Sequence, residues 1–139
     1  MIGHAFRGKV IRTGGTRVDL PIDVELFYDP ERDPLAVRMV LDSGGESEVE
    51  WFFARDLLVG AHESTHSVGD GDIRFQMVGV IWPHSGLSVC LRNPTGHADL
   101  LLPHYDVKAF LDESAPWFRA AEEGLDDRMN AAIEEMLNG

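Results

Sequence analysis

The stretch Val18-Asp19-Leu20-Pro21-Ile22-Asp23-Val24-Glu25-Leu26-Phe27-Tyr28 carries the clearest structural pattern in the sequence. Every second residue from Val18 to Tyr28 is apolar or aromatic, and acidic residues occupy several of the positions between them. Successive side chains of a strand point to opposite faces of a sheet, so this period of two predicts a long strand with one buried face. We therefore expect a fold in which β-structure dominates.

Two glycine pairs predict hairpins on either side of this strand. Gly14-Gly15 precedes it and Gly44-Gly45 follows it, and two-residue glycine loops favour hairpins because primed turns require positive φ. The alternation returns in residues 35–41 and 49–53, and the two prolines in residues 29–34 predict a loop because proline cannot donate to a β-ladder. The first 53 residues thus predict a four-stranded antiparallel meander.

The pattern changes after residue 53. Residues 54–59 predict a short helix ended by Gly60, and residues 61–71 predict a polar loop. We then expect strands over residues 72–77, 87–92 and 97–102. The first either continues through Trp82 or, if Gly79 marks a break, is followed by a separate fourth strand. A second meander that packs on the first predicts two packed antiparallel sheets, in the order meander, helix, meander, within a β-dominated α+β fold.

The tail predicts two C-terminal helices within about residues 105–138 of a single domain that spans residues 1–139. The first covers residues 105–113, and the second begins at Ser114 as its cap, with Pro116 in its first turn. The second helix carries an apolar stripe at steps of three and four, which is expected to pack on the sheets or against another copy of the chain: Trp117, Phe118, Ala121, Leu125, Met129, Ala132, Ile133, Met136 and Leu137.

Charge and composition exclude several classes of protein. The 139 residues include 12 basic and 24 acidic side chains, a net charge of −12, which repels phosphate backbones and anionic lipid headgroups. We therefore expect no nucleic-acid binding. The sequence shows no signal peptide and no apolar run long enough to cross a membrane, and its single cysteine, Cys90, cannot form an internal disulfide. These features predict a cytoplasmic protein without direct membrane insertion.

Candidate chemistry in the sequence is sparse. His62 and His66 have the i, i+4 spacing of a helical metal pair, with Glu63 between them, but a zinc site needs three or four ligands and no further ligand motif accompanies them. Gly69-Asp70-Gly71-Asp72 lacks the lysine of a phosphate-binding loop, and a turn before a strand is favoured. We expect no cofactor, no metal and no catalytic residue.

Three ordered motifs resemble those of the SsgA-like sporulation and cell-division proteins. They are Leu26-Phe27-Tyr28-Asp29-Pro30 with Asp33-Pro34-Leu35-Ala36-Val37, then Glu50-Trp51-Phe52-Phe53-Ala54-Arg55-Asp56-Leu57-Leu58, then Gly69-Asp70-Gly71-Asp72-Ile73-Arg74. The resemblance implies a non-enzymatic role in sporulation-specific septation, in which the protein positions or recruits the division protein FtsZ, or binds FtsZ's septal recruiters. It also implies a whirly-like fold, a homotrimer and a place at the division septum.

Two groups of residues follow from these motifs. A structural role at the corner between strand and helix is expected for Trp51, Phe53, Arg55, Asp56, Leu57 and Leu58, and in the following turn for Gly69, Gly71 and Asp72. Loops commonly carry recognition, which makes Asp29, Glu31, Arg32, Asp33, His62, Glu63 and His66 the candidates for partner binding. The alternative function is single-stranded nucleic-acid binding of the whirly type, and the dispersed basic residues speak against it.

Overall fold

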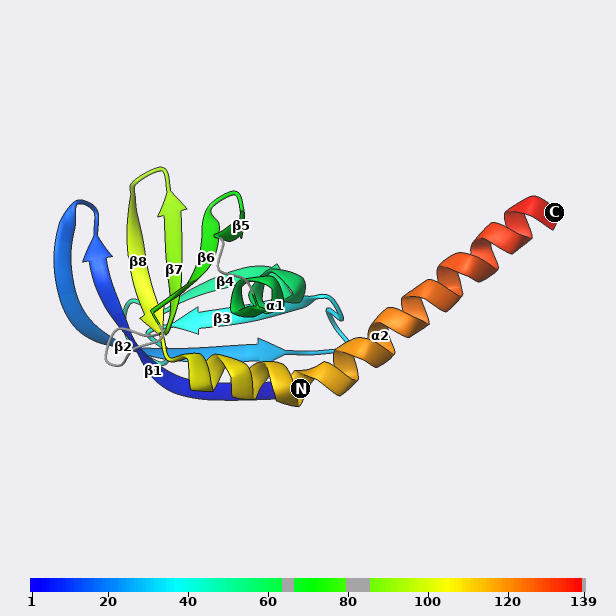
Figure 1. Ribbon diagram of the computed structural model, residues 1–139, viewed down its shortest axis with the longest axis horizontal. Helices are drawn as coiled ribbons and strands as arrows, with labels where there is room; N and C mark the ends of the chain where they lie inside the picture. Colours follow the sequence, from blue (N-terminus) through cyan, green and yellow to red (C-terminus); the bar gives the residue numbers. More distant parts are fainter. Residues whose placement is uncertain (64–66, 80–85, 139) are drawn as a thin grey trace.

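The computed structural model describes residues 1–63, 67–79 and 86–138. The elements in these ranges are β1 (Ile2–Thr13), β2 (Thr16–Tyr28), β3 (Ala36–Leu41), β4 (Val49–Ala54), α1 (Arg55–Glu63), β5 (Val68–Asp70), β6 (Ile73–Val78), β7 (Gly86–Asn93), β8 (Gly96–Leu102) and α2 (His104–Asn138). Figure 1 shows a curled sheet with α1 inside its curl and with the second half of α2 extending away from it.

The first meander is confirmed. β1 pairs with β2 up to Thr13↔Thr16, and the turn between them places Gly14 at a φ of 59°. β2 pairs with β3, and β3 with β4, all antiparallel. The buried face of β2 is the one predicted from the alternation in the sequence. Val24, Leu26 and Tyr28 are fully buried, while the residues between them are more exposed.

The expectation of two packed sheets is wrong. The described strands form one sheet in the order β4-β3-β2-β1-β8-β7-β6-β5, because the second half of β1 pairs with β8 through Lys9↔Leu101 and Val10↔Leu100. A register shift between Val10 and Arg12 interrupts the ladder there. Irregularities of this kind bend a strand and increase its twist, which helps the sheet to curl. Both meanders thereby gain a paired edge that two separate sheets would leave open.

The curl encloses one core. The rings of Phe53 on β4 and Phe75 on β6 have centroids 4.9 Å apart, although five strands lie between β4 and β6 in the sheet. Leu58 and Ala61 of α1 and Val107 and Phe110 of α2 are fully buried in the same cluster. Helix α1 therefore fills the curl, and the first half of α2 covers it.

Helix α1 differs from its prediction at its end. It continues through Gly60 to Glu63 instead of ending at residue 59. The predicted loop over residues 61–71 is therefore wrong at two places, because Ala61–Glu63 are helical and Val68–Asp70 form β5. Glycine inside a helix costs about 1 kcal/mol relative to alanine. Complete burial of Ala61, the residue directly after Gly60, offsets that cost, because its side chain contacts the core.

Helix α2 is one helix of 35 residues rather than two. Pro116 lies inside it and removes one backbone hydrogen bond, which commonly bends a helix instead of ending it when the freed carbonyl groups find other donors. Figure 1 shows the change of direction near the middle of α2. Ser114 is not an exposed cap, because its side chain is fully buried.

The strand order determines which strands lie at the edges of the sheet. Residues 87–91 are not an edge, because β7 pairs with both β6 and β8. Strand β6 ends at Val78, and the predicted continuation through Trp82 falls on residues 80–82, outside the described part of the chain. The edges of the described sheet are β4 and β5. Among the described helices, none is long and apolar enough to cross a membrane.

Candidate functional site

The loop between β2 and β3 is held in one conformation by its own hydrogen bonds. The Oδ1 atom of Asp29 accepts from the backbone N–H groups of Glu31 and Arg32 at 3.2 and 3.3 Å, and the backbone oxygen of Asp29 accepts from the N–H of Asp33 at 2.9 Å. Glu31, Arg32 and Asp33 remain exposed. These four residues, predicted from sequence as partner-binding candidates, therefore lie together on a preformed surface loop.

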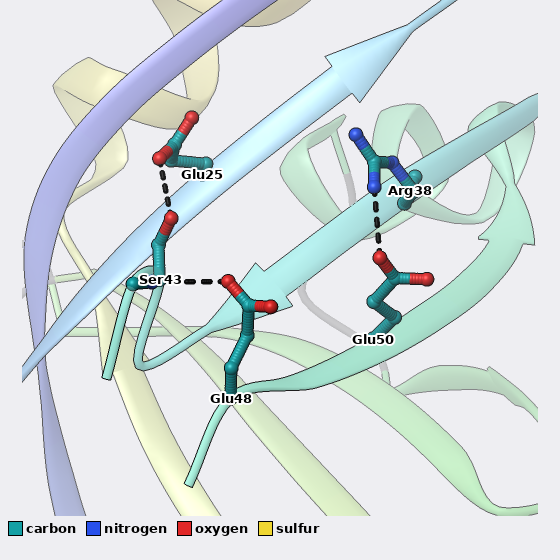
Figure 2. Close-up of polar contacts among 6 residues, drawn as sticks. Glu25, Arg38, Ser43, Glu48 and Glu50 are labelled. Carbon is teal, nitrogen blue, oxygen red and sulfur yellow. Dashed lines mark hydrogen bonds and ion pairs between the residues drawn. The ribbon is translucent and has the colours of Figure 1, made fainter. Parts of the chain in front are cut away.

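A ladder of aromatic and charged side chains runs beside this loop on the convex face of the sheet. Phe27, Arg38 and Phe52 are register partners across β2, β3 and β4. The Cζ atom of Arg38 lies 4.4 Å from the centroid of the Phe27 ring, and its Nη1 donates to Glu50 at 2.8 Å, as Figure 2 shows. Phe52 is 61% exposed. The ladder thus presents an ordered guanidinium beside a large uncovered aromatic ring.

Loop and ladder line one depression of about 410 Å³. Asp29, Arg32 and Asp33 contribute from the loop, and Phe27, Arg38 and Phe52 from the strands. Gly3 on β1 leaves room for the Phe27 ring, since a Cβ atom there would lie 3.1 Å from two of the ring carbons. Sequence reasoning missed the strand residues, although Phe52 had a visible signal: it is an aromatic residue on the outward side of an alternating strand.

The connection between β3 and β4 is also ordered by polar contacts. The hydroxyl of Ser43 donates to Glu25, and the backbone N–H of Gly44 donates to Glu48 at 3.0 Å (Figure 2). Asp42, which has a positive φ of 54°, accepts from the backbone N–H of Ser47 at 3.1 Å through Oδ2. These contacts order the connection that leads into β4.

A second predicted group lies elsewhere. His62 and Glu63 belong to the last turn of α1, while His66 falls outside the described residues. His62 and Glu63 line a groove of about 500 Å³ between α1 and α2, which shares no residue with the depression at the β2–β3 loop. In the part of the chain that the structure describes, no three histidine, cysteine or acidic side chains come close enough together to hold a metal ion.

Arg55 connects the two helices at the bend of α2. It is only 5% exposed, and its Nε and Nη2 atoms donate to Ser114 Oγ at 2.9 Å and to the Leu111 carbonyl oxygen at 2.8 Å. Its Cζ atom lies 4.6 Å from the centroid of the Phe118 ring. Burial lowers the pKa of Arg55 below its usual value. Asp56 lies in the first turn of α1, where a carboxylate is favoured by the helix dipole.

Tyr28 extends this contact to the β2–β3 loop. Its ring meets that of Phe118 edge to face at 6.3 Å between centroids, and its hydroxyl donates to the Pro34 carbonyl oxygen at 2.9 Å. Burial raises the pKa of Tyr28, so the phenol keeps its proton well above neutral pH. The loop, the start of α1 and the bend of α2 are thereby joined through three buried side chains.

The remaining motif residues lie in the core or in a turn. Phe53 and Leu58 are buried, while Trp51 and Leu57 are partly buried against the core. Gly71 adopts a φ of 61° in the turn between β5 and β6, whereas Gly69, predicted to lie in the same turn, belongs to β5. A Cβ atom at Gly69 would lie 2.7 Å from the Ile73 carbonyl oxygen, and the backbone oxygen of Asp72 accepts from Arg92 N–H at 2.8 Å.

Cys90 offers no activated nucleophile. It lies on β7 and is half-buried, and burial raises the pKa of its thiol, whereas a catalytic thiolate requires a lowered pKa. The described surface therefore offers ordered loops, an exposed aromatic ring and charged side chains, which are features of macromolecular recognition.

Comparison with known proteins assigns the family. Residues 22–123 match the family model of the Streptomyces sporulation and cell division protein SsgA. The sporulation-specific cell division protein SsgB of Streptomyces coelicolor is 41% identical over 98 residues, which span 66% of this chain and 64% of that protein. SsgB of Thermobifida fusca is 30% identical over 128 residues, which span 88% of this chain and 86% of that protein.

Solved structures agree with this assignment. One, from a study of SsgB mutations that correlate with longitudinal cell division during sporulation of Streptomyces coelicolor, superposes with a TM-score of 0.71 at 27% identity, over 88% of this chain and 94% of that one. The SsgA-like sporulation-specific cell division protein of Thermobifida fusca shares the fold, with a TM-score of 0.70 at 23% identity over 97% and 96%. The chain belongs to the SsgA family of sporulation and cell division proteins, with SsgB proteins among its relatives.

Proposed function

We propose that this protein acts without catalysis in sporulation-specific septation. In this proposal it lies in the cytoplasm at the division septum, where it positions or recruits the tubulin-like protein FtsZ, or binds FtsZ's septal recruiters, through protein contacts. The observation that carries the proposal is the family match over residues 22–123, which includes the aromatic ladder, the β2–β3 loop and the bend of α2. Relatives with this match are sporulation-specific cell division proteins.

The surface supports a function by protein contact. Phe52 and Arg38 place an exposed aromatic ring beside an ordered arginine next to the β2–β3 loop, and aromatic residues and arginine are enriched where proteins bind each other. Single-stranded nucleic-acid binding is not favoured, because it requires a basic track with aromatic platforms and the chain carries a net charge of −12. The loop and the ladder are accordingly our candidates for partner recognition.

The second half of α2 supports self-association, for which we propose a homotrimer. Its apolar residues follow a repeat of eleven, since Phe118, Ala121 and Leu125 are followed eleven positions later by Met129, Ala132 and Met136. An eleven-residue repeat keeps an apolar stripe nearly straight along a helix, and small alanine side chains let helices approach closely. Met129 is 61% exposed and Met136 is 82% exposed. Phe118 is buried within its own chain, and we assign another copy of the chain as the cover of the part of the stripe that follows it.

Charge on the second half of α2 is compatible with that assignment. At 100° per residue, Glu123, Asp127 and Glu134 fall on the side of the helix opposite the stripe. Three copies packed through their stripes would therefore keep these acids in solvent. Arg55 holds the bend from which this half of the helix departs, which fixes its direction relative to the sheet.

Fluorescent tagging in the native host tests the function. The proposal predicts that the tagged protein forms regularly spaced bands that coincide with FtsZ during sporulation, and that deletion of its gene reduces the number of sporulation septa. A diffuse signal throughout sporulation, together with normal septation in the deletion strain, would contradict the proposal. A tagged Tyr105→Ala variant, altered at an exposed residue outside the candidate surfaces, serves as the control.

A further inference from the structure

Among the described strands, β4 has a hydrogen-bonded neighbour on one side only. It ends the order of the described sheet, with β3 as its single partner strand. Arg55 N–H donates to the Leu35 carbonyl oxygen at 2.9 Å, so these two residues face each other as a hydrogen-bonded pair. Every second pair along the ladder has the same geometry, namely Val37↔Phe53, Met39↔Trp51 and Leu41↔Val49. In an antiparallel ladder, hydrogen-bonded pairs alternate with pairs whose N–H and C=O groups point away. The backbone groups of Glu50 and Phe52 therefore point toward the free edge.

Depressions flank this edge on both faces of the sheet. On the concave face, a groove of about 690 Å³ is lined by Val49 and Trp51 of β4 and by Leu91 and Leu100 across the curl. On the convex face, the depression of about 410 Å³ is lined by Phe52 and Arg38. Glu50 lines both. A strand added beside β4 would point successive side chains to opposite faces of the sheet, and so into the two depressions in turn.

The other edge of the sheet lacks these features. Strand β5 has only three residues, and α1 packs against it. Short edge strands and covering helices are common ways to block further pairing. The open strand β4, with six residues, is twice as long. This difference singles out β4 as the edge where a further strand can be added.

The acidic residues beside β4 indicate which kind of segment binds at this edge. Residues 42–50 form the β3–β4 connection and the first two positions of β4. They contain Asp42, Glu46, Glu48 and Glu50 and no basic residue. Pairing of β4 with β4 of a second copy would bring these like charges together, which is destabilising. A basic segment would instead be attracted. We propose that the free edge of β4 binds an extended, basic segment of a partner protein, in which apolar side chains that enter the concave groove alternate with lysine or arginine.

This inference rests on the proposed function in so far as the occupant is a protein, but its test uses purified components. The probes are two capped peptides of about eight residues, the length of an ordinary strand. One alternates lysine with valine and the other alternates glutamate with valine. Binding is followed by NMR titration and by amide hydrogen exchange. We expect the lysine peptide to bind at least about tenfold more tightly than the glutamate peptide and to slow exchange at Glu50 and Phe52.

A proline substitution isolates the contribution of the backbone. Phe52→Pro removes an N–H that points away from β3, a position where edge strands tolerate proline, and Phe52→Ala removes the same side chain but keeps the N–H. We expect Phe52→Pro to bind the lysine peptide at least about tenfold more weakly than Phe52→Ala.

Three results would overturn the inference: equal affinity for the two peptides, no binding up to about 1 mM, or unchanged amide exchange at Glu50 and Phe52 in the peptide complex. The last comparison uses the unsubstituted protein, so it decides the question even if Phe52→Pro fails to fold. Septal localisation is a separate measurement, and its loss would contradict the proposed function without affecting the result for β4.

Discussion

The two halves of α2 belong to one helix and have opposite surroundings. Before Pro116, the helix buries Val107, Phe110, Leu111 and Ser114 against the curled sheet and α1. Beyond it, Phe118 is the last buried residue, and Ile133 is 50% and Leu137 80% exposed. Figure 1 shows the second half extending from the body of the protein. Both halves are amphipathic in sequence, so the apolar pattern alone does not decide which half has a partner within the chain.

The bend therefore separates a part of α2 that packs within the chain from a part that is available to other copies of the chain. The first half completes the core, and its contribution should appear as stability of the folded chain. The second half adds little to that core, and its apolar stripe should appear instead as association between copies. The bend is held by Arg55 and Ser114, the two buried polar residues of the described chain. Substitutions on the two sides of Pro116 should therefore have different consequences.

Phe110→Ala should have the largest effect. The ring is fully buried in the core cluster, and truncation of such a residue typically costs about 3–5 kcal/mol in the free energy of unfolding. Urea denaturation measures this loss. Tyr105→Ala, on the exposed side of the same half, is the matched control and should change stability by less than about 0.5 kcal/mol. Equal losses in the two variants would break the distinction between the buried and exposed sides.

Arg55→Met should have the next largest effect. It leaves the buried Ser114 hydroxyl and the Leu111 carbonyl without the guanidinium donor, which costs about 1–3 kcal/mol. Arg55→Lys should recover only part of this stability, because one ammonium group does not reproduce the two-atom geometry of the guanidinium. Full stability in Arg55→Met would show that the bend does not depend on this contact. Arg32→Met, at an exposed loop residue, controls for loss of a positive charge.

Glu50→Gln should have a small effect on the ladder beside the β2–β3 loop. It weakens the 2.8 Å ion pair with Arg38, which lies on the partly exposed convex face and is expected to contribute about 0.2–1 kcal/mol. The loss should shrink as salt is added, since salt screens exposed charges. Thermal unfolding at low and high salt provides the measurement, and a loss independent of salt would argue against a role for the ion pair.

The double substitution Met129→Glu and Ile133→Glu should have the smallest effect on the isolated chain. Both side chains are at least half exposed, so the stability of the dilute protein should change by less than about 0.5 kcal/mol. The same change should abolish association, because it introduces charge into the stripe. The matched control, Glu123→Gln with Asp127→Asn, alters the opposite side of the helix and should leave association intact. A strong loss of stability without a change in mass would reverse the assignment.

Local patterns in the sequence predicted the strands well. The alternation from Val18 to Tyr28 predicted the buried face of β2, and Gly14-Gly15 predicted the turn between β1 and β2. These features depend on neighbouring residues only. The pairing of β1 with β8 joins segments about ninety positions apart, and nothing local in either strand specifies its partner.

The candidate site was predicted in part for the same reason. Asp29, Glu31, Arg32 and Asp33 were visible as a loop because Pro30 and Pro34 interrupt the strands on either side. The contributions of Phe27 and Arg38 depend on strand register, which sequence spacing does not fix. At Pro116, a local rule predicted a helix start, but the contacts of Arg55 with Leu111 and Ser114 support a continuous, bent helix. Tertiary contacts outweighed local propensity there.

Light scattering on the purified full-length protein tests most directly whether the second half of α2 is covered by other copies. We expect a mass three times the 15.4 kDa of one chain, which falls to 15.4 kDa when Met129 and Ile133 are replaced by glutamate. A mass of 15.4 kDa for the unsubstituted protein across a wide concentration series would contradict it.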